Sequence, residues 1–214
     1  MPHPFDAVAV RTWCAQALDA LGRARETIDA INVYPVADAD TGTNLYLTVE
    51  SAARAVEAAC AGDPTPAQAV RAMAHGALIG ARGNSGTILA QLLRGMAEEI
   101  GAGDGEAGGT GSAGKAAEAA AKDDAELLRR ALCRAAVSAR AAVARPVEGT
   151  VLTVAAAAAE AAATADGDCA AVARAAWAAA RTALEATPEQ LPALSRAGVV
   201  DAGGYGLVTV LGAL

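Results

Sequence analysis

The sequence predicts an all-α fold of roughly eight helices, and three observations lead to this prediction. Hydrophobic residues make up 54% of the 214-residue chain, yet aromatic residues make up only 3%, and alanine supplies most of the apolar positions. Alanine is the best helix former and fills little volume, so closely packed helices are the expected outcome. Apolar residues recur at helical spacing, and no segment shows the sustained apolar–polar alternation of a strand.

The first half of the chain contains four expected helices. Asp6, after two prolines, is a plausible start for the first, and apolar residues follow it at near-helical spacing. The second shows apolar positions at steps of three and four residues. Thr65 followed by Pro66 is a typical cap and first helical position, and it predicts the start of the third. These helices are expected to cover residues 5–30, 44–61, 66–79 and 87–100.

Residues 101–122 are rich in glycine and alanine and contain no large apolar residue. Such a segment has no side chain to anchor it in a core, so we expect a flexible loop within a single domain that spans residues 1–214. The sequence ends at DAGGYGLVTVLGAL, inside a helix that has just begun, which favours the N-terminal part of a longer chain. Between the loop and this last helix, helices are expected at residues 123–144, 150–165, 169–186 and 189–196.

Composition argues against several classes of protein. The net charge of −7 is the opposite of what a nucleic-acid-binding face requires. No apolar run is long enough to span a membrane, and the N-terminus MPHPFDAVAV lacks the pattern of a secretory signal. The four cysteines are scattered without a C-x-x-C pair, which predicts small buried thiols rather than a zinc site or a disulfide framework. We therefore expect a soluble, cytoplasmic protein.

Four glycine-containing breaks, DADTGTN, GARGNSG, RPVEGT and DAGGYG, interrupt the helical pattern, and each opens a helix. A helix start exposes unpaired backbone N–H groups and the positive end of the helix dipole, which together favour anions. Glycine lets the backbone approach a ligand closely, and Thr, Ser or Asn beside it can cap the helix or donate to a phosphate. Each break taken alone is better explained as an ordinary turn and cap, but four of them in one chain, one with a D-x-D pair, are harder to dismiss as turns.

The first break carries two carboxylates, Asp38 and Asp40, two positions apart. Carboxylates with this spacing in a loop can face one centre, and their hard oxygen atoms suit Mg²⁺, which commonly joins carboxylates to substrate phosphates. Helix capping combined with solvation explains the same pair equally well. From the residues alone, the segment is therefore a candidate Mg²⁺–phosphate site, and the residues do not indicate which ligand binds or which reaction takes place.

Other residues offer weaker signals. His3 and His75 are the only histidines, so histidine-based nucleophilic or metal chemistry is not expected. The chain has no G-x-x-x-x-G-K-[ST] motif, which excludes a P-loop protein. Arg129, Arg130 and Arg134 are interpreted as a solvated stripe on one helix.

Four segments, NVYPVADADTGTNLYLT, GARGNSGTILAQLLRG, RPVEGTVLTVA and LSRAGVVDAGGYGL, resemble the successive motifs of one nucleotide-binding domain. This domain is shared by bacterial fatty acid kinases and the L subunit of dihydroxyacetone kinase. The segments follow the family's order and cover nearly the whole chain. The resemblance implies an up-and-down barrel of eight antiparallel helices, with ATP and two Mg²⁺ ions bound at one end.

The resemblance also implies roles for individual residues. Asp38 and Asp40 would be the catalytic pair that holds both Mg²⁺ ions, and a third ligand would be Asn32 or, as an alternative, Asp29. The implied phosphate contacts are Thr41, Thr43, Asn44, Ser85 and Gly86, with Gly42, Gly83 and Asn84 in the same two loops. The implied contacts on the nucleoside side of the pocket are Thr150, Asp201, Gly203 and Gly204.

Within the family, the fatty acid kinase branch is favoured. Thr41 stands where dihydroxyacetone kinases have histidine, and the NVYP and GARGNSG runs are of the fatty acid kinase type. Ala37 and Ala39 depart from that type, which has proline and glycine there. Ala39 would strain the loop if its φ angle were positive.

The expected activity is transfer of the γ-phosphoryl group of ATP to the carboxylate of a fatty acid, giving an acyl phosphate. The resemblance implies that a separate fatty-acid-binding protein presents the acid, and a homodimer of the full-length protein stays open. Two alternatives remain: the nucleotide-binding subunit of a dihydroxyacetone kinase, and a non-catalytic regulatory module that binds nucleotide.

Overall fold

The computed structural model describes residues 6–103 and 113–214, and within these ranges the chain forms helices and no strands. The predicted all-α class is therefore confirmed. Eight of the helices in the described ranges are long, and two, α8 and α9, are short. The helices are α1 (Ala7–Ala30), α2 (Thr41–Cys60), α3 (Pro66–Gly80), α4 (Gly83–Gly103), α5 (Ala113–Ala141), α6 (Val151–Thr164), α7 (Cys169–Glu185), α8 (Thr187–Gln190), α9 (Pro192–Ala197) and α10 (Ala202–Leu211).

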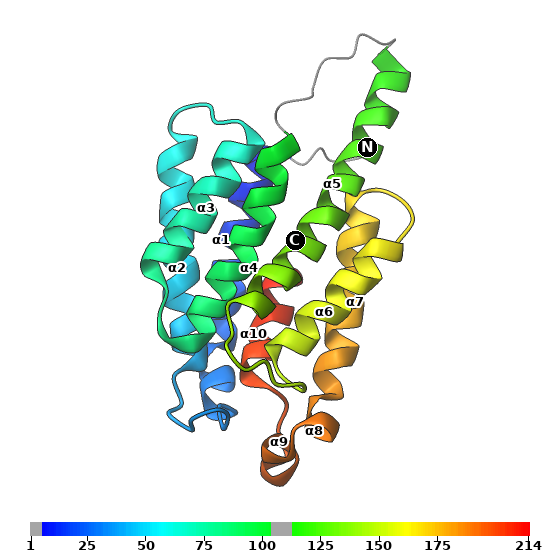
Figure 1. Cartoon of the computed structure of the whole chain (residues 1–214). Coiled ribbons are helices and arrows are strands. Elements are labelled where there is room, and N and C mark those ends of the chain that lie inside the picture. Colours follow the sequence, from blue (N-terminus) through cyan, green and yellow to red (C-terminus); the bar gives the residue numbers. More distant parts are fainter. Residues whose placement is uncertain (1–5, 104–112) are drawn as a thin grey trace.

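The long helices form a closed ring. Each packs against the next one along the chain, and α10 packs against both α7 and α1. Neighbouring helices run up and down, so the connections alternate between the two ends of the ring (Figure 1). Residues 31–40, 81–82, 142–150 and 186–201 all lie at the same end, the lower one in Figure 1. The four sequence breaks thus meet in space.

Small residues bring the helices close together. Buried residues of all eight long helices form one core in which alanine alternates with leucine and valine. At Gly95 of α4, an added Cβ would lie 2.7 Å from the carbonyl oxygen of Arg134 and 2.8 Å from the Cα of Ala135 on α5. Contacts this short leave no room for a side chain, so glycine sets the distance between these two helices.

Two predicted helix starts are confirmed in atomic detail. The carboxylate of Asp6 accepts a hydrogen bond from the backbone N of Ala9 at 2.8 Å. Thr65 and Gln68 form a capping box, in which the hydroxyl of Thr65 accepts from the N of Gln68 and the side chain of Gln68 accepts from the N of Thr65. These bonds satisfy N–H groups that have no partner inside the helix.

Other boundaries differ from the prediction. Helices α2 and α4 start at Thr41 and Gly83, earlier than expected, so the polar motifs form their first turns. The expected helix at residues 189–196 is divided into α8 and α9 around Leu191.

The predicted loop at residues 101–122 is wrong at both ends. Residues 101–103 belong to α4, and α5 begins at Ala113. The alanine-rich start of α5 extends a helix that is packed further along the chain, and such a stretch needs helix propensity rather than large apolar side chains. Residues 104–112 lie outside the described residues.

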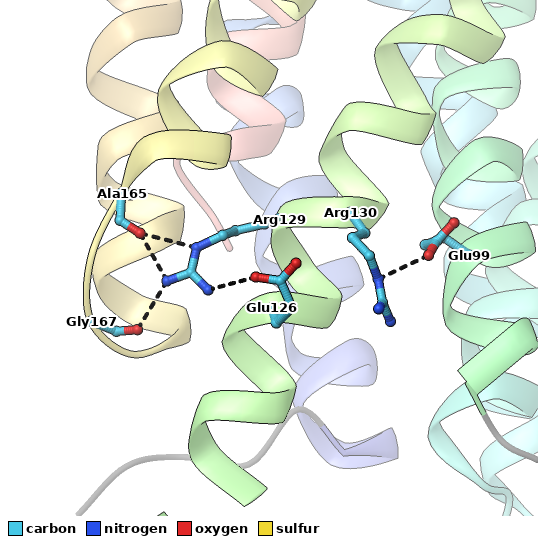
Figure 2. Close-up of polar contacts among 6 residues, drawn as sticks. All are labelled: Glu99, Glu126, Arg129, Arg130, Ala165 and Gly167. Carbon is cyan, nitrogen blue, oxygen red and sulfur yellow. Dashed lines mark hydrogen bonds and ion pairs between the residues drawn. The ribbon is translucent and has the colours of Figure 1, made fainter. Parts of the chain in front are cut away.

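The predicted arginine stripe is wrong for Arg129. Its side chain is only 18% exposed and donates to the carbonyl oxygen of Ala165 at 3.0 and 2.8 Å and to that of Gly167 at 3.4 Å (Figure 2). The neighbouring Arg130 points to the other side of α5 and pairs with Glu99 of α4 at 3.0 Å (Figure 2). Adjacent arginines thus connect α5 to different neighbours.

The cysteines in the structure are all free. Only Cys14 is buried, and burial raises the pKa of its thiol to about 12. The prediction of buried thiols is therefore wrong for the partly exposed Cys60, Cys133 and Cys169. Among the described helices, none combines the length and the apolar character that crossing a membrane requires.

Candidate functional site

A cavity of about 660 Å³ opens at the end of the ring where the four breaks meet. Its wall comes from the loop before α2, the first turns of α2, α4 and α6, the loop before α6, and the start of α10. Eleven of the residues that the sequence singled out line it: Asn32, Asp38, Asp40, Thr41, Asn44, Gly83, Asn84, Ser85, Thr150, Asp201 and Gly203.

Four other predicted residues do not line the cavity. Gly42 packs against the backbone of Arg25 on α1, and Gly86 packs against Thr48 on α2. Thr43 donates to Asp29 from both its backbone N, at 3.0 Å, and its hydroxyl, at 2.7 Å. The backbone N of Gly204 donates to the carboxylate of Asp201. These four residues therefore support the structure around the cavity through their contacts with neighbouring residues and do not form its wall.

The two loop carboxylates differ in their surroundings. The amide of Asn32 donates to Oδ1 of Asp38 at 2.6 Å, and Asn32 itself is buried. Asp40 occupies the N-cap position of α2, yet its side chain makes no capping hydrogen bond. Helix capping, one of the two interpretations left open by the sequence, therefore does not describe Asp40.

The structure also distinguishes the two candidates for a third metal ligand, Asn32 and Asp29. Asp29 does not line the cavity, and its carboxylate is engaged by Thr43. Asn32 lines the cavity beside Asp38, and its amide oxygen is the atom that could ligate a metal ion. Within the described part of the chain, no group of three or more His, Cys, Asp or Glu side chains could hold a metal ion.

The oxygen atoms of these residues fit a Mg²⁺ ion whose coordination would be completed by a bound substrate. Mg²⁺ commonly takes one or two protein carboxylates and fills its other positions with water and substrate phosphates, rather than sitting in an all-protein cage. Asp38 and Asp40, with the amide oxygen of Asn32, supply oxygen donors of this type, and Asp40 is not used for capping.

Four long helices begin at the cavity. Thr150 caps α6, its hydroxyl accepting from the N of Leu152 and donating to the carbonyl oxygen of Val147 at 2.7 Å. The first turns of α2 and α4 place Thr41, Asn44 and Ser85 in the wall. Aligned helix starts concentrate N–H donors and positive dipole ends, so this end of the ring favours an anionic ligand such as a phosphate chain.

Asp201 is a buried carboxylate in the cavity wall. It caps α10 by accepting from the backbone N of Gly204 at 2.7 Å, and its own N donates to the hydroxyl of Thr187 at 3.1 Å. Burial raises the pKa of Asp201 to about 6, and hydrogen bonds from the backbone N–H groups of Gly204 and Val151 oppose that rise. The carboxylate therefore joins the starts of α10 and α6 at a cost in desolvation.

The sequence analysis missed several residues of the wall. Arg145 lines the cavity, as do the aromatic ring of Tyr34 and the apolar side chains of Val36, Val143 and Val147. Arg145 and Val147 belong to the RPVEGT motif, so the motif could have suggested them. An apolar wall of this kind suits the flat face of a nucleobase.

A family model described as the DAK2 domain matches residues 35–214. Protein YloV of Bacillus subtilis is 42% identical over 193 residues, which is 89% of this chain and 32% of that protein. An uncharacterized protein of Staphylococcus aureus strain USA300 is 37% identical over 198 residues, or 91% of this chain and 33% of that protein. The chain thus spans about a third of the length of these curated relatives.

The fold is also similar to a solved structure. The crystal structure of the dihydroxyacetone kinase of C. freundii, in its native form, superposes with a TM-score of 0.62. The match covers 95% of this chain and 33% of that one, at 17% sequence identity. At this level of identity the likeness establishes the fold alone.

Proposed function

The chain belongs to the DAK2 domain family, and on this premise we propose that it binds Mg-ATP and transfers the γ-phosphoryl group to the carboxylate of a fatty acid. One observation carries the proposal. Asp38 and Asp40 line the same cavity as the first turns of α2, α4 and α6 and the start of α10. Oxygen ligands for a divalent cation and N–H donors for phosphates thus meet in one place, as phosphoryl transfer requires.

Each part of the wall has a role in this proposal. Bound Mg²⁺ would neutralise charge on the β- and γ-phosphates, and Asp38, Asp40 and Asn32 would hold it. Thr41, Asn44 and Ser85 would position the phosphates. Thr150, Asp201 and Gly203, with the apolar wall, would bind the nucleoside.

The acceptor chemistry suits this site. A carboxylate is already ionised near neutral pH, so its oxygen can attack the γ-phosphorus without a general base. The bond from that phosphorus to the bridging oxygen breaks, a phosphorus–oxygen bond to the carboxylate forms, and ADP leaves. The choice of a fatty acid rests on the resemblance of the NVYP and GARGNSG segments, and the acid would be presented by a fatty-acid-binding partner protein.

A second candidate is supported by the fold. The similar solved structure is that of a dihydroxyacetone kinase, so dihydroxyacetone, presented by its own carrier subunit, is an alternative acceptor. Thr41, which stands in place of the histidine of that branch, argues against it.

The test supplies ATP and Mg²⁺ with each acceptor in turn. Acyl phosphate is trapped as a hydroxamate by hydroxylamine when the acceptor is a fatty acid on its carrier, and dihydroxyacetone phosphate is measured in the parallel reaction. We expect hydroxamate alone, and none with Asp38→Ala. Dihydroxyacetone phosphate would favour the second candidate, and nucleotide binding with neither product would favour a non-catalytic module.

A further inference from the structure

The cavity has an uneven charge. Its wall carries three carboxylates, those of Asp38, Asp40 and Asp201, and one cationic side chain among the described residues, that of Arg145. ATP brings several further negative charges, and two of the carboxylates are engaged in the proposed metal site. Arg145 is therefore the side chain of the wall that can offset charge on the phosphates directly.

Arg145 has no carboxylate partner in the described part of the chain. The nearest acidic residue in its loop, Glu148, is engaged elsewhere: it accepts from Arg140 at 3.0 Å and from the hydroxyl of Thr153 at 2.7 Å. The carboxylate of Glu148 thus pairs with a different arginine, Arg140. The guanidinium stays exposed at the cavity with its donors available.

The backbone of the loop that carries Arg145 is held in place by close contacts and a hydrogen bond. Gly149 has a φ of 77°, and an added Cβ there would lie 2.9 Å from the Cβ of Leu191, so the backbone fits closely against the segment between α8 and α9. The backbone N of Gly149 donates to Thr153 at 2.9 Å. Pro146 further restricts the backbone of Arg145 to extended conformations. A loop whose backbone is fixed in this way loses less conformational entropy when a ligand binds to its side chains, so binding is favoured.

The loop with Arg145 and the loop with the two aspartates lie on opposite sides of the ring. The loop with Asp38 and Asp40 joins α1 to α2, and the loop with Arg145 joins α5 to α6, half a turn of the closed ring away. Both loops nevertheless reach the same cavity. A phosphate chain held by the two aspartates through Mg²⁺ would therefore meet Arg145 from the opposite side.

We propose that Arg145 is a catalytic residue that binds the terminal phosphoryl group of ATP through its guanidinium. The proposal deepens the function proposed above and rests on it. A guanidinium presents paired N–H donors that match two phosphate oxygens, so its contribution is both charge and orientation.

The test measures binding by calorimetry in the presence of Mg²⁺, using ADP and a non-hydrolysable ATP analogue. For Arg145→Gln we expect affinity for the ATP analogue to fall about tenfold or more, because a charge-assisted bidentate contact is lost. Affinity for ADP, which lacks the terminal phosphate, should fall less than about threefold. Arg145→Lys keeps the charge without the paired geometry, so its affinity for the analogue should be intermediate.

Arg196→Gln is the matched control, since Arg196 is an exposed arginine of α9 at the same end of the ring and does not line the cavity. It should bind both nucleotides as the wild type does. Wild-type affinity of Arg145→Gln for the analogue, an equal loss for ADP, or a lowered melting temperature would each overturn the proposal. A wild-type chain that bound neither nucleotide would instead refute the proposed function itself, and the role of Arg145 with it.

Discussion

Ala39 lies between the two cavity aspartates with a φ of 53°, in the left-handed region that side chains with a Cβ disfavour. Glycine adopts this region freely, although it also gains freedom in the unfolded chain. We expect Ala39→Gly to raise the free energy of unfolding by about 0.5–1 kcal/mol, measured by urea denaturation. Ala37→Gly, at a position with negative φ, should lower it. A loss of stability in Ala39→Gly would contradict the strain.

Asp40 offers a test that separates binding from folding. An N-cap aspartate normally contributes about 1 kcal/mol to stability, but the side chain of Asp40 makes no capping bond. Asp40→Ala should therefore leave the melting temperature unchanged and greatly weaken Mg-ATP binding. Asp168, whose carboxylate caps α7 by accepting from Ala171 at 2.9 Å, is the matched control. Asp168→Ala should lose about 1 kcal/mol and keep its nucleotide affinity.

Asp201 predicts a pH dependence of stability. Its pKa is raised from 3.8 to about 6 in the folded chain, so the folded state binds this proton more tightly than the unfolded state does. The contribution of Asp201 to stability is thus full below pH 4 and is lost as the pH rises to about 6. Relative to Asp201→Asn, the wild type should lose about 3 kcal/mol across this window. Urea unfolding of both proteins from pH 4 to pH 7 measures the difference, and parallel curves would refute it.

At the scale of elements, the adjacent arginines Arg129 and Arg130 of α5 allow two substitutions to be compared. Arg129 is mostly buried and holds the carbonyl groups of Ala165 and Gly167 in the turn between α6 and α7 (Figure 2). Arg129→Ala leaves those acceptors without their charged donor and should cost about 1–3 kcal/mol. Arg130→Ala removes an ion pair between an exposed arginine and the partly exposed Glu99, and should cost less than about 1 kcal/mol. Equal losses in thermal unfolding would show that Arg129 has no special role in the turn.

Helices were predictable from the sequence to the extent that local signals define them. The caps at Asp6 and Thr65 are local, and both are confirmed. The starts of α2 and α4 were placed too late because glycine, threonine and asparagine indicate a loop, whereas here they form first turns next to a cavity. The motif RPVEGT pointed to the loop of Arg145, but the sequence did not single out Arg145 itself, because the pairing of Glu148 with Arg140 is a contact that spacing does not reveal.

At the scale of the whole molecule, ring closure depends on contacts between residues far apart in the chain. The indole N–H of Trp13 on α1 donates to the carbonyl oxygen of Val210 on α10 at 2.9 Å. Helical periodicity predicts that each of these helices has an apolar face, but it cannot pair the first helix with the last. The resemblance implied a barrel of helices with its ligands at one end, and the closed ring agrees with the barrel. Closure in turn brings four separate breaks to one cavity.

The shape of the interior leads to a last prediction about the acceptor. The cavity inside the ring, lined by residues such as Trp13, Leu93 and Leu207, measures about 30 Å³, the share of a single water molecule in the liquid. The groove over α10 is larger, but charged side chains, among them Asp19 and Arg181, line it. Neither offers an apolar channel for a long acyl chain.

We therefore expect this chain to bind Mg-ATP and yet form little acyl phosphate from free fatty acid. Transfer requires both substrates to be held in line within a few ångströms, and a free acid would have to find that alignment by diffusion. Hydroxylamine trapping with free acid, beside calorimetry with Mg-ATP on the same sample, measures both halves of the expectation. Rapid hydroxamate formation without any partner would mean that the chain holds the acyl group itself, and the two-protein model would then be wrong.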